Sequence, residues 1–231
     1  MTEYDNRQTG AYRNQQALKQ HQQEQLSIIK ADYQEFCGTL LDIGCANGTF
    51  IEALRAVYPT ASYTGIDLSE ELIELARRRL PGDDVSLFVE NVLSYQPASG
   101  FDIIIASGVL SIFEDPELIL KKWLSWINSG GRLYIFGRFN SKNIDTIVRF
   151  RNNYNKGDWE GGLTSYSIQT VSRVLEQSGY KHAFKRFDLN MELAESEDPI
   201  RTYTVNCQNG TKLVLNGANT VAEHYFLTVT R

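Results

Sequence analysis

Cysteine and histidine are scarce in this sequence, and their scarcity excludes several kinds of protein. The 231 residues include three cysteines (Cys37, Cys45 and Cys207) and three histidines, and no Cys-x-x-Cys pair occurs. An odd number of scattered cysteines argues against a disulfide framework and against a zinc site. We therefore expect no bound metal.

Long apolar runs and a signal-peptide pattern are also missing from the sequence. A membrane-spanning helix needs about 20 consecutive apolar residues, so we expect a cytoplasmic protein with no membrane partner. The net charge of −5 does not favour a polyanionic partner such as nucleic acid. Hydrophobic residues make up 42% of the chain, which is ordinary for a globular protein of one or two domains.

The stretch 39–50 carries the most informative local pattern. Residues 39–43 form a short apolar run that predicts a buried strand ending at Gly44, and apolar residues then recur at helical spacing from a helix start near Gly48. Glycine allows a sharp turn and the close approach of a ligand, and a helix start offers free N–H groups and positive potential. The turn is therefore either an ordinary strand-to-helix connection or a ligand-binding loop.

A second apolar strand, 61–66, is followed directly by Asp67. This acid lies 19 residues after Gly48 in the sequence. At this position in a nucleotide-binding fold, a carboxylate can accept hydrogen bonds from the hydroxyls of a ribose. The alternative role for Asp67 is to cap the next helix, for which Ser69 is the predicted N-cap.

Written as Asp42-x-Gly44-x-x-x-Gly48, the loop resembles that of the class I S-adenosylmethionine-dependent methyltransferases, with Ala46 at the family's usual middle glycine. The resemblance runs from about residue 38 to the C-terminus and is strongest over residues 40–137. It implies an α/β fold with a Rossmann-like, doubly wound sheet of about seven strands, helices on both faces and an antiparallel last strand. We expect one domain, 1–231, made of an N-terminal helical cap (1–36), a cofactor-binding core (38–137) and an acceptor-side part (138–231).

The later segments agree with this plan. Further strands are predicted over 85–89, 101–106, 132–136, 183–189 and 225–229. A helix capped by Asp115 should bury a stripe that includes Ile127 and should end at Gly130-Gly131. Another helix is expected over 167–178, and two short runs within 202–215, joined through Asn209-Gly210, predict an extra C-terminal hairpin.

The N-terminal residues 1–25 contain seven glutamines, which by themselves favour a solvated helix. In the family that the sequence resembles, an N-terminal helix lies over the amino-acid end of the cofactor. Tyr12 and Arg13 are the candidates for contact with the cofactor's carboxylate there.

The resemblance also implies where S-adenosylmethionine would bind. Family members often carry Gly-Asp after the third strand, where this chain has Asn91. Its amide oxygen can accept a hydrogen bond from the adenine amino group, while the Val92 N–H meets a ring nitrogen, although a simple turn explains the segment equally well. The full set of expected cofactor residues is Tyr12, Arg13, Gly44, Cys45, Ala46, Asn47, Gly48, Asp67, Leu68, Asn91, Val92, Ser107 and Gly108.

Residues 138–166 form a polar stretch rich in aromatic residues, which is either a surface loop or a lid over a site. The family commonly places acceptor-binding residues in this part of the chain. We expect a small-molecule acceptor there, methylated on oxygen or nitrogen. The candidate acceptor-binding residues are Arg138, Asn140, Tyr154, Trp159 and Tyr166.

No catalytic base is predicted from the sequence. Methyl transfer from a sulfonium mainly requires that donor and acceptor be held in line, so a base depends on the acceptor. His21, His182 and His224 are each more simply explained as exposed or structural residues, and the two late ones are expected away from the cofactor end.

Three other functions remain open. A methyltransferase could act on a protein, a glycan or nucleic acid, although this chain lacks the Pro-Pro-Tyr and Pro-Cys signatures of DNA enzymes. An NAD-dependent oxidoreductase would also use Asp67, but the spelling of the first loop argues against it. A non-catalytic cofactor-binding protein would share every feature described so far. The oligomeric state is unknown.

Overall fold

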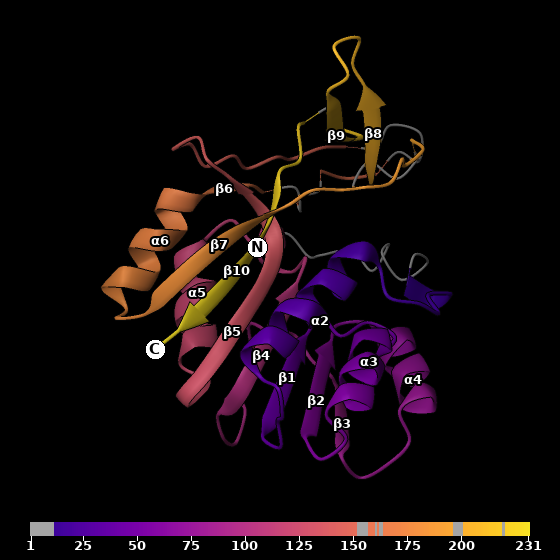
Figure 1. Ribbon diagram of the computed structural model, residues 1–231, viewed down its shortest axis with the longest axis vertical. Helices are drawn as coiled ribbons and strands as arrows, with labels where there is room; N and C mark the ends of the chain where they lie inside the picture. The colour runs from indigo at the N-terminus through magenta and orange to yellow at the C-terminus, as the bar shows by residue number, and fades with distance from the viewer. Residues whose placement is uncertain (1–11, 152–156, 160, 162–163, 196–200, 219) are drawn as a thin grey trace.

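The protein is built around one sheet whose main strands follow the order β3-β2-β1-β4-β5-β10-β7 (Figure 1). The computed structural model describes residues 12–151, 157–159, 161, 164–195, 201–218 and 220–231. Neighbours from β3 to β5 are parallel, whereas β10 is antiparallel to both β5 and β7. The predicted Rossmann-like fold with an antiparallel last strand is therefore confirmed. The strands are β1 (Thr39–Ile43), β2 (Ser62–Asp67), β3 (Val85–Val89), β4 (Phe101–Ser107), β5 (Ile127–Asn140), β7 (Lys181–Phe187) and β10 (His224–Thr230), with the short β6 (Tyr166–Ser167) beside the end of β5.

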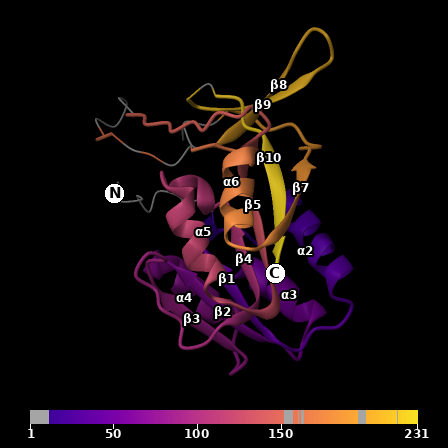
Figure 2. The same cartoon turned by 90° about the vertical axis from the view of Figure 1, so that its left-hand side faces the viewer.

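Helices cover both faces of this sheet, as the two views show (Figures 1 and 2). Buried side chains of α2, α3 and α4 form one apolar cluster with the sheet. Those of α5 and α6 form another cluster on the opposite face. Strand β4 lies between these layers, and Ile103, Ile104 and Ile105 are all fully buried. The helices are α2 (Gln20–Asp32), α3 (Thr49–Val57), α4 (Glu70–Arg79), α5 (Pro116–Leu124) and α6 (Ile168–Gln177), with the short 3-10 helix η2 (Leu110–Ile112) before α5.

Side-chain caps fix where several of these helices begin. Ser69, Asp115 and Ser167 each accept a hydrogen bond from a backbone N–H three residues later in the chain. The predicted starts of α4, α5 and α6 are confirmed by these caps.

The predicted end of α5 is wrong. The helix stops at Leu124, and Ile127 is the first residue of β5 rather than part of the helical stripe. Ile127 pairs with Phe101, and after a register shift Arg132 pairs with Ile103, so Gly130 lies inside an irregular part of β5. Ile127 completes a helical pattern of apolar residues, but it joins the sheet because it pairs with Phe101 of β4.

The carboxyl ends of the parallel strands meet at one edge, and this edge carries the site. Ser107 at the end of β4 pairs with Phe136 of β5, which in turn pairs with Phe226 of β10. Because β10 runs in the opposite direction, it begins at this edge, and its first residue, His224, lies opposite Arg138. The expectation that His224 lies away from the cofactor end is therefore wrong.

The predicted C-terminal hairpin is confirmed and forms a separate two-stranded sheet of β8 (Thr202–Asn206) and β9 (Lys212–Asn216). It projects from the main body beyond the carboxyl edge (Figures 1 and 2). Backbone hydrogen bonds from Thr204 to Leu193 and from Ala222 to Val214 tie it to the segments on either side. No helix among the described residues is long and apolar enough to cross a bilayer.

Candidate active site

The loop between β1 and α3 turns through three left-handed residues. Gly44, Ala46 and Gly48 have φ angles of 73°, 49° and 76°. The N–H groups of Gly44 and Cys45 both donate to the carbonyl oxygen of Ile66, at 2.8 and 3.1 Å. These two hydrogen bonds fix the loop to the end of β2. The loop then leads directly into the N-terminus of α3.

Asp67 fastens this loop from the neighbouring strand. One carboxylate oxygen accepts from the Ala46 N–H at 2.9 Å, and the other accepts from the Ser69 N–H at 2.9 Å. Burial raises the pKa of Asp67, while these backbone hydrogen bonds act in the opposite direction. Asp67 therefore orders the glycine loop and helps to start α4, in addition to any contact with a ribose.

The two glycines of the motif are constrained by the protein itself. A Cβ on Gly44 would lie 2.7 Å from Cγ2 of Val109. A Cβ on Gly48 would lie 2.7 Å from Cδ1 of Leu80 and 3.2 Å from Cβ of Ala76, so Gly48 allows α4 to pack closely. Gly48 thus has a packing role that the sequence interpretation, based on ligand approach, did not include.

A segment that we call the N-terminal strap, residues 12–19, crosses over the loop. Nδ2 of Asn47 donates to the backbone oxygens of Tyr12 and Gln15, at 2.7 and 2.9 Å. Nη2 of Arg79 also donates to the Gln15 oxygen, at 2.9 Å. These hydrogen bonds from the β1–α3 loop and from α4 help to hold the strap in place.

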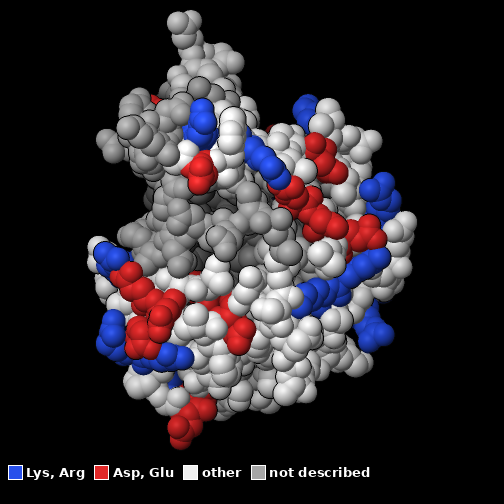
Figure 3. All heavy atoms as spheres, turned by 180° about the vertical axis from the view of Figure 1, so that it is seen from behind, with Lys and Arg blue, Asp and Glu red and all other residues white. Residues whose placement is uncertain are grey.

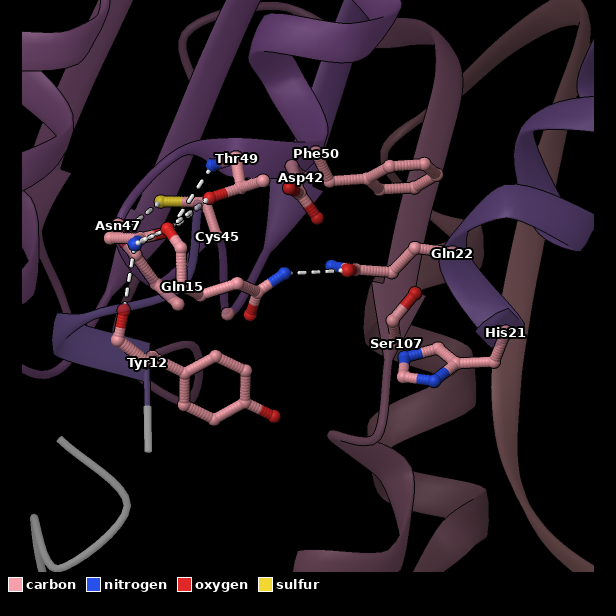
Figure 4. A pocket seen from close by; sticks show the side chains of 12 residues that line it. Tyr12, Gln15, His21, Gln22, Asp42, Cys45, Asn47, Thr49, Phe50 and Ser107 are labelled. Atoms are coloured by element: carbon pink, nitrogen blue, oxygen red, sulfur yellow. Dashed lines mark hydrogen bonds between the residues drawn. The ribbon is translucent and has the colours of Figure 1, made fainter. Parts of the chain in front are cut away.

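Beneath the strap, a partly open cavity of about 30 Å³ separates it from the loop (Figure 4). This space holds only a few water molecules, whereas ligand pockets are commonly about 300–1,000 Å³. The lining residues are Tyr12, Gln15, His21, Gln22, Asp42, Gly44, Cys45, Ala46, Asn47, Thr49, Phe50 and Ser107.

The lining includes six of the predicted cofactor residues, but Arg13 is placed elsewhere. Its guanidinium forms two hydrogen bonds with the carboxylate of Glu71, at the start of α4. Arg13 is therefore an exposed ion-pair partner here, and the structure does not place it against the cavity. The six residues that line the cavity are Tyr12, Gly44, Cys45, Ala46, Asn47 and Ser107.

Four other predicted cofactor residues, Leu68, Asn91, Val92 and Gly108, do not line the cavity. Leu68 follows Asp67 and is 42% exposed, which is high for a leucine. Oδ1 of Asn91 accepts from the Leu93 N–H at 2.9 Å, as in a simple turn, and Val92 packs against the apolar cluster of α5. Gly108 has a left-handed φ of 76° and open space where a Cβ would stand.

Polar groups of α2 are buried at the cavity, contrary to the expectation of a solvated helix. Gln22 and Gln25 are 9% and 1% exposed. Oε1 of Gln22 accepts from Nε2 of Gln15 at 2.8 Å, and Oε1 of Gln25 accepts from the hydroxyl of Ser107 at 2.5 Å. These hydrogen bonds allow amide side chains to be buried over the carboxyl edge.

Asp42 places a buried acid in the cavity, at 3% exposure. Its burial, together with the nearby charge of Asp67, raises the pKa of Asp42 to about 8. Burial also raises the pKa of the Cys45 thiol well above its usual value. Both groups are therefore largely protonated at neutral pH, and Asp42 can donate as well as accept a hydrogen bond.

Two imidazoles stack on Phe136 at this edge. The rings of His21 and Phe136 are 4.4 Å apart with an interplanar angle of 7°, and those of His224 and Phe136 are 5.4 Å apart at 10°. Burial is the main reason why the pKa of each histidine falls to about 3. Charges add to this effect: Lys19 and His224 act on His21, and Arg138 acts on His224.

The predicted acceptor residues do not share one cavity. Tyr166 is 1% exposed, and its hydroxyl donates to the Phe113 oxygen, so it belongs to the core. Nδ2 of Asn140 donates to the Ile144 oxygen and to Oγ of Ser165, which orders the loop.

Trp159, Arg138 and Tyr154 complete the set of acceptor candidates. Trp159 is 60% exposed, with the guanidinium of Arg151 lying 5.5 Å from its ring. Arg138 stays near the site, and burial lowers its pKa to about 10. Tyr154 lies outside the described residues.

The sequence interpretation missed several lining residues. Asp42 belonged to the quoted motif and was recoverable from it, as the acid that precedes the first glycine. Thr49 and Phe50 directly follow Gly48 at the start of α3. Gln15, His21 and Gln22 carried no local signal, because long-range packing brings α2 and the strap over the loop. The missed residues are Gln15, His21, Gln22, Asp42, Thr49 and Phe50.

Comparison with known proteins gives the site a family context. A family model described as a methyltransferase domain matches residues 41–133. The malonyl-[acyl-carrier protein] O-methyltransferase of Priestia megaterium is 26% identical over 147 residues, which cover 60% of this chain and 52% of that protein. The trans-aconitate 2-methyltransferase of Rhodopseudomonas palustris is 32% identical over 99 residues, which cover 42% of this chain and 38% of that protein. The chain thus spans about half, or less, of the length of these relatives.

Among solved structures, the DhpI–SAM–HEP complex superposes with a TM-score of 0.64 at 14% identity, covering 97% of this chain and 93% of the other. At that identity the likeness shows the fold alone. Within the described ranges, no group of three or more histidine, cysteine or acidic side chains is arranged to hold a metal ion. Residues 41–133 therefore match a methyltransferase domain, and the strand order and the glycine loop of this segment agree with that match.

Proposed function

We propose that this protein binds S-adenosylmethionine at the carboxyl ends of β1, β2 and β4 and transfers its methyl group to oxygen or nitrogen of a small-molecule acceptor. The observation that carries the proposal is the cavity itself. It joins the left-handed Gly44–Gly48 loop, the N-terminus of α3 and the buried acid Asp42 under one strap.

The polar groups around the cavity suit the amino-acid end of this cofactor. Among the described residues that line the cavity, Gln15 has its Oε1 buried without a hydrogen-bond partner. With Asp42, the Gln15 oxygen offers acceptors for an ammonium group, and the first N–H groups of α3 offer donors for a carboxylate. Buried polar atoms left unpaired are costly, so a ligand that satisfies them is favoured.

S-adenosylmethionine supplies an electrophilic methyl group on a positively charged sulfur. The part of this chain that would hold the donor is the rigid β1–α3 loop with Asp67, while residues of β5 and β10 lie on the acceptor side. Because positioning alone is worth roughly 7–11 kcal/mol, such a site needs no metal to accelerate transfer.

An anionic small molecule is the acceptor class that the residues favour. Both relatives described above carry the name of a carboxylic acid in their own names, malonyl and trans-aconitate. In this chain Arg138 holds a largely buried guanidinium at the acceptor edge, where it is suited to a carboxylate or phosphate. On the face seen from behind, basic and acidic side chains are interspersed rather than gathered into a basic field for nucleic acid (Figure 3).

Methyl transfer should be assayed with donor labelled in its methyl group and a panel of hydroxy acids, carboxylic acids and amines. We expect a product heavier by one methyl group and the appearance of S-adenosylhomocysteine. Binding of the donor without transfer to any member of the panel would instead support a non-catalytic cofactor-binding protein.

The Asp67→Asn variant should bind S-adenosylmethionine about 10–100-fold more weakly, because it loses a charge-assisted acceptor and mismatches one of two backbone donors. Calorimetry on the folded variant measures this change. Asp102→Asn is the matched control, since Asp102 accepts from the Thr39 N–H at the opposite edge of the sheet. Equal affinities for Asp67→Asn and wild type would rule out this role of Asp67.

On the acceptor side, Arg138→Gln and Trp159→Ala should each raise the Michaelis constant of the acceptor about tenfold, with unchanged cofactor affinity. The reason is the loss of a cation at Arg138 and of an apolar surface at Trp159. Arg186→Gln, an exposed change on β7, serves as control. A loss of cofactor binding, or of stability alone, would show that the acceptor binds elsewhere.

A further inference from the structure

The first turn of α2 joins two parts of the molecule that lie far apart in the sequence. On one side, Oε1 of Gln22 accepts from Nε2 of Gln15 at 2.8 Å (Figure 4) and from the Lys19 N–H at 2.9 Å, which ties the turn to the strap. On the other side, Gln20 contacts the chain that follows β7. Because Gln15 and Gln22 both line the cavity, this turn begins at the proposed donor site.

Gln20 holds the chain after β7 through both ends of its side-chain amide. Nε2 donates to the backbone oxygen of Asp188 at 3.1 Å, and Oε1 accepts from the Asn190 N–H at 3.1 Å. Between these two residues, Leu189 packs against the small aromatic cluster on this face of the sheet. An amide that donates and accepts at the same time fixes the orientation of the segment as well as its distance from α2.

The same segment is bonded to the hairpin. The Thr204 N–H donates to the Leu193 oxygen at 3.0 Å, and the Leu193 N–H donates to Oγ1 of Thr204 at 2.9 Å. A third hydrogen bond runs from Nδ2 of Asn206 to Oε1 of Glu192 at 2.8 Å. Strand β8 is therefore linked, through residues 188–193, to Gln20 and the start of α2.

The hairpin is also anchored at the acceptor edge. The Ala222 N–H donates to the Val214 oxygen of β9 at 2.8 Å, and two residues later His224 begins β10 opposite Arg138. Two residues of extended chain span at most about 7 Å, so the anchor lies close to the strand on the acceptor side. The chain of contacts that starts at the cavity thus ends beside the proposed acceptor site.

On the basis of the proposed function, we propose that Gln20 is a positioning residue that couples the donor site to the hairpin. Bound S-adenosylmethionine fixes the strap and the first turn of α2, and Gln20 then fixes residues 188–193 and the hairpin. A ligand that orders one segment lowers the cost of ordering the segments bonded to it, which couples two sites without a large change of shape. Coupling free energies are reciprocal, so donor and acceptor each raise the affinity of the other by the same factor.

The coupling is tested first without an acceptor, by amide hydrogen exchange with S-adenosylhomocysteine as the ligand. At saturation, exchange in residues 188–193 and 202–216 of the wild type should slow at least about threefold, because local opening of these segments becomes rarer. Gln20→Leu should bind the same ligand within about threefold of the wild-type affinity, yet these segments should not respond. No response in the saturated wild type, or an equal response in Gln20→Leu, would overturn the proposal. A failure of the ligand to bind the wild type would instead overturn the proposed function.

Glu24→Gln is the matched control. Glu24 lies one turn further along α2, and its carboxylate pairs with Nζ of Lys185 on β7 at 2.7 Å. The variant removes a contact between this helix and β7 but leaves the amide of Gln20 in place, so the hairpin should respond to the ligand as in the wild type. If Glu24→Gln abolishes the response as completely as Gln20→Leu, general loosening of α2 explains the effect and the role of Gln20 is refuted.

An acceptor found in the panel gives a second, independent reading. Its dissociation constant should be about fivefold or more lower with S-adenosylhomocysteine bound in the wild type, and should change less than about twofold in Gln20→Leu. Because Gln20 is proposed to touch neither reactant, kcat with both substrates saturating should stay within about threefold of the wild type. Coupling of wild-type size in Gln20→Leu would contradict the proposal, as would a loss of kcat without any loss of coupling.

Discussion

A Gly44→Val variant should bind S-adenosylmethionine at least about 1,000-fold more weakly than wild type, a loss of about 4 kcal/mol. Gly44 has a φ of 73°, a conformation that a β-branched residue adopts only with strain. The new side chain would also meet Val109, whose Cγ2 lies 2.7 Å from the position of the added Cβ. The loop must then leave Ile66 and Asp67, to which its N–H groups are bonded.

Two further variants separate the causes of this effect. Gly179 has a similar φ of 78° but open space around an added Cβ, so Gly179→Val should cost stability and leave binding unchanged. Adding Val109→Ala to Gly44→Ala should recover part of the affinity that Gly44→Ala loses. Normal binding by a folded Gly44→Val protein would mean that the loop is only a turn.

The second large effect concerns acid stability. The pKa of His224 is lowered from 6.5 to about 3, mainly by burial and then by the charge of Arg138. In the unfolded chain this imidazole takes up a proton below about pH 6.5, while in the folded protein it stays neutral. Stability is therefore fully present above pH 6.5 and is lost as the pH falls toward 3, by about 1.4 kcal/mol per pH unit.

Replacing His224 with phenylalanine should remove this loss. The position lies against Phe136 and Phe187, so an apolar ring suits its surroundings. Between about pH 7.5 and pH 4.5 the wild type should lose roughly 2.7 kcal/mol more than His224→Phe. Asp42 changes stability in the opposite sense between about pH 4 and 8, but it is present in both proteins and cancels. Denaturant unfolding at both pH values measures the difference, and parallel losses in the two proteins would contradict a buried neutral His224.

Local patterns in the sequence were enough to predict the framework of the donor site. The strand over Thr39–Ile43, the turn at Gly44 and the position of Asp67 follow from apolar periodicity, glycine and spacing within one short stretch. Helix caps such as Ser69 are equally local, because the side chain bonds within its own turn.

The residues that cover the site are placed there by long-range contacts, which no local sequence pattern predicts. Gln22 and Gln25 are buried where Gln15 of the strap and Ser107 at the end of β4 donate to their amide oxygens. His224 reaches the site because an antiparallel strand begins where the parallel strands end, a consequence that the sequence analysis did not apply. Ile127 left its helical pattern for the same kind of reason, pairing with a strand more than 20 residues earlier in the chain.

The central claim is that the cavity beneath the strap is a site for S-adenosylmethionine, and a calorimetric titration of the wild-type protein tests it most directly. The account predicts saturable binding of one S-adenosylmethionine per chain, displaced by S-adenosylhomocysteine and unaffected by NAD. The absence of binding, or its displacement by NAD, would contradict the account.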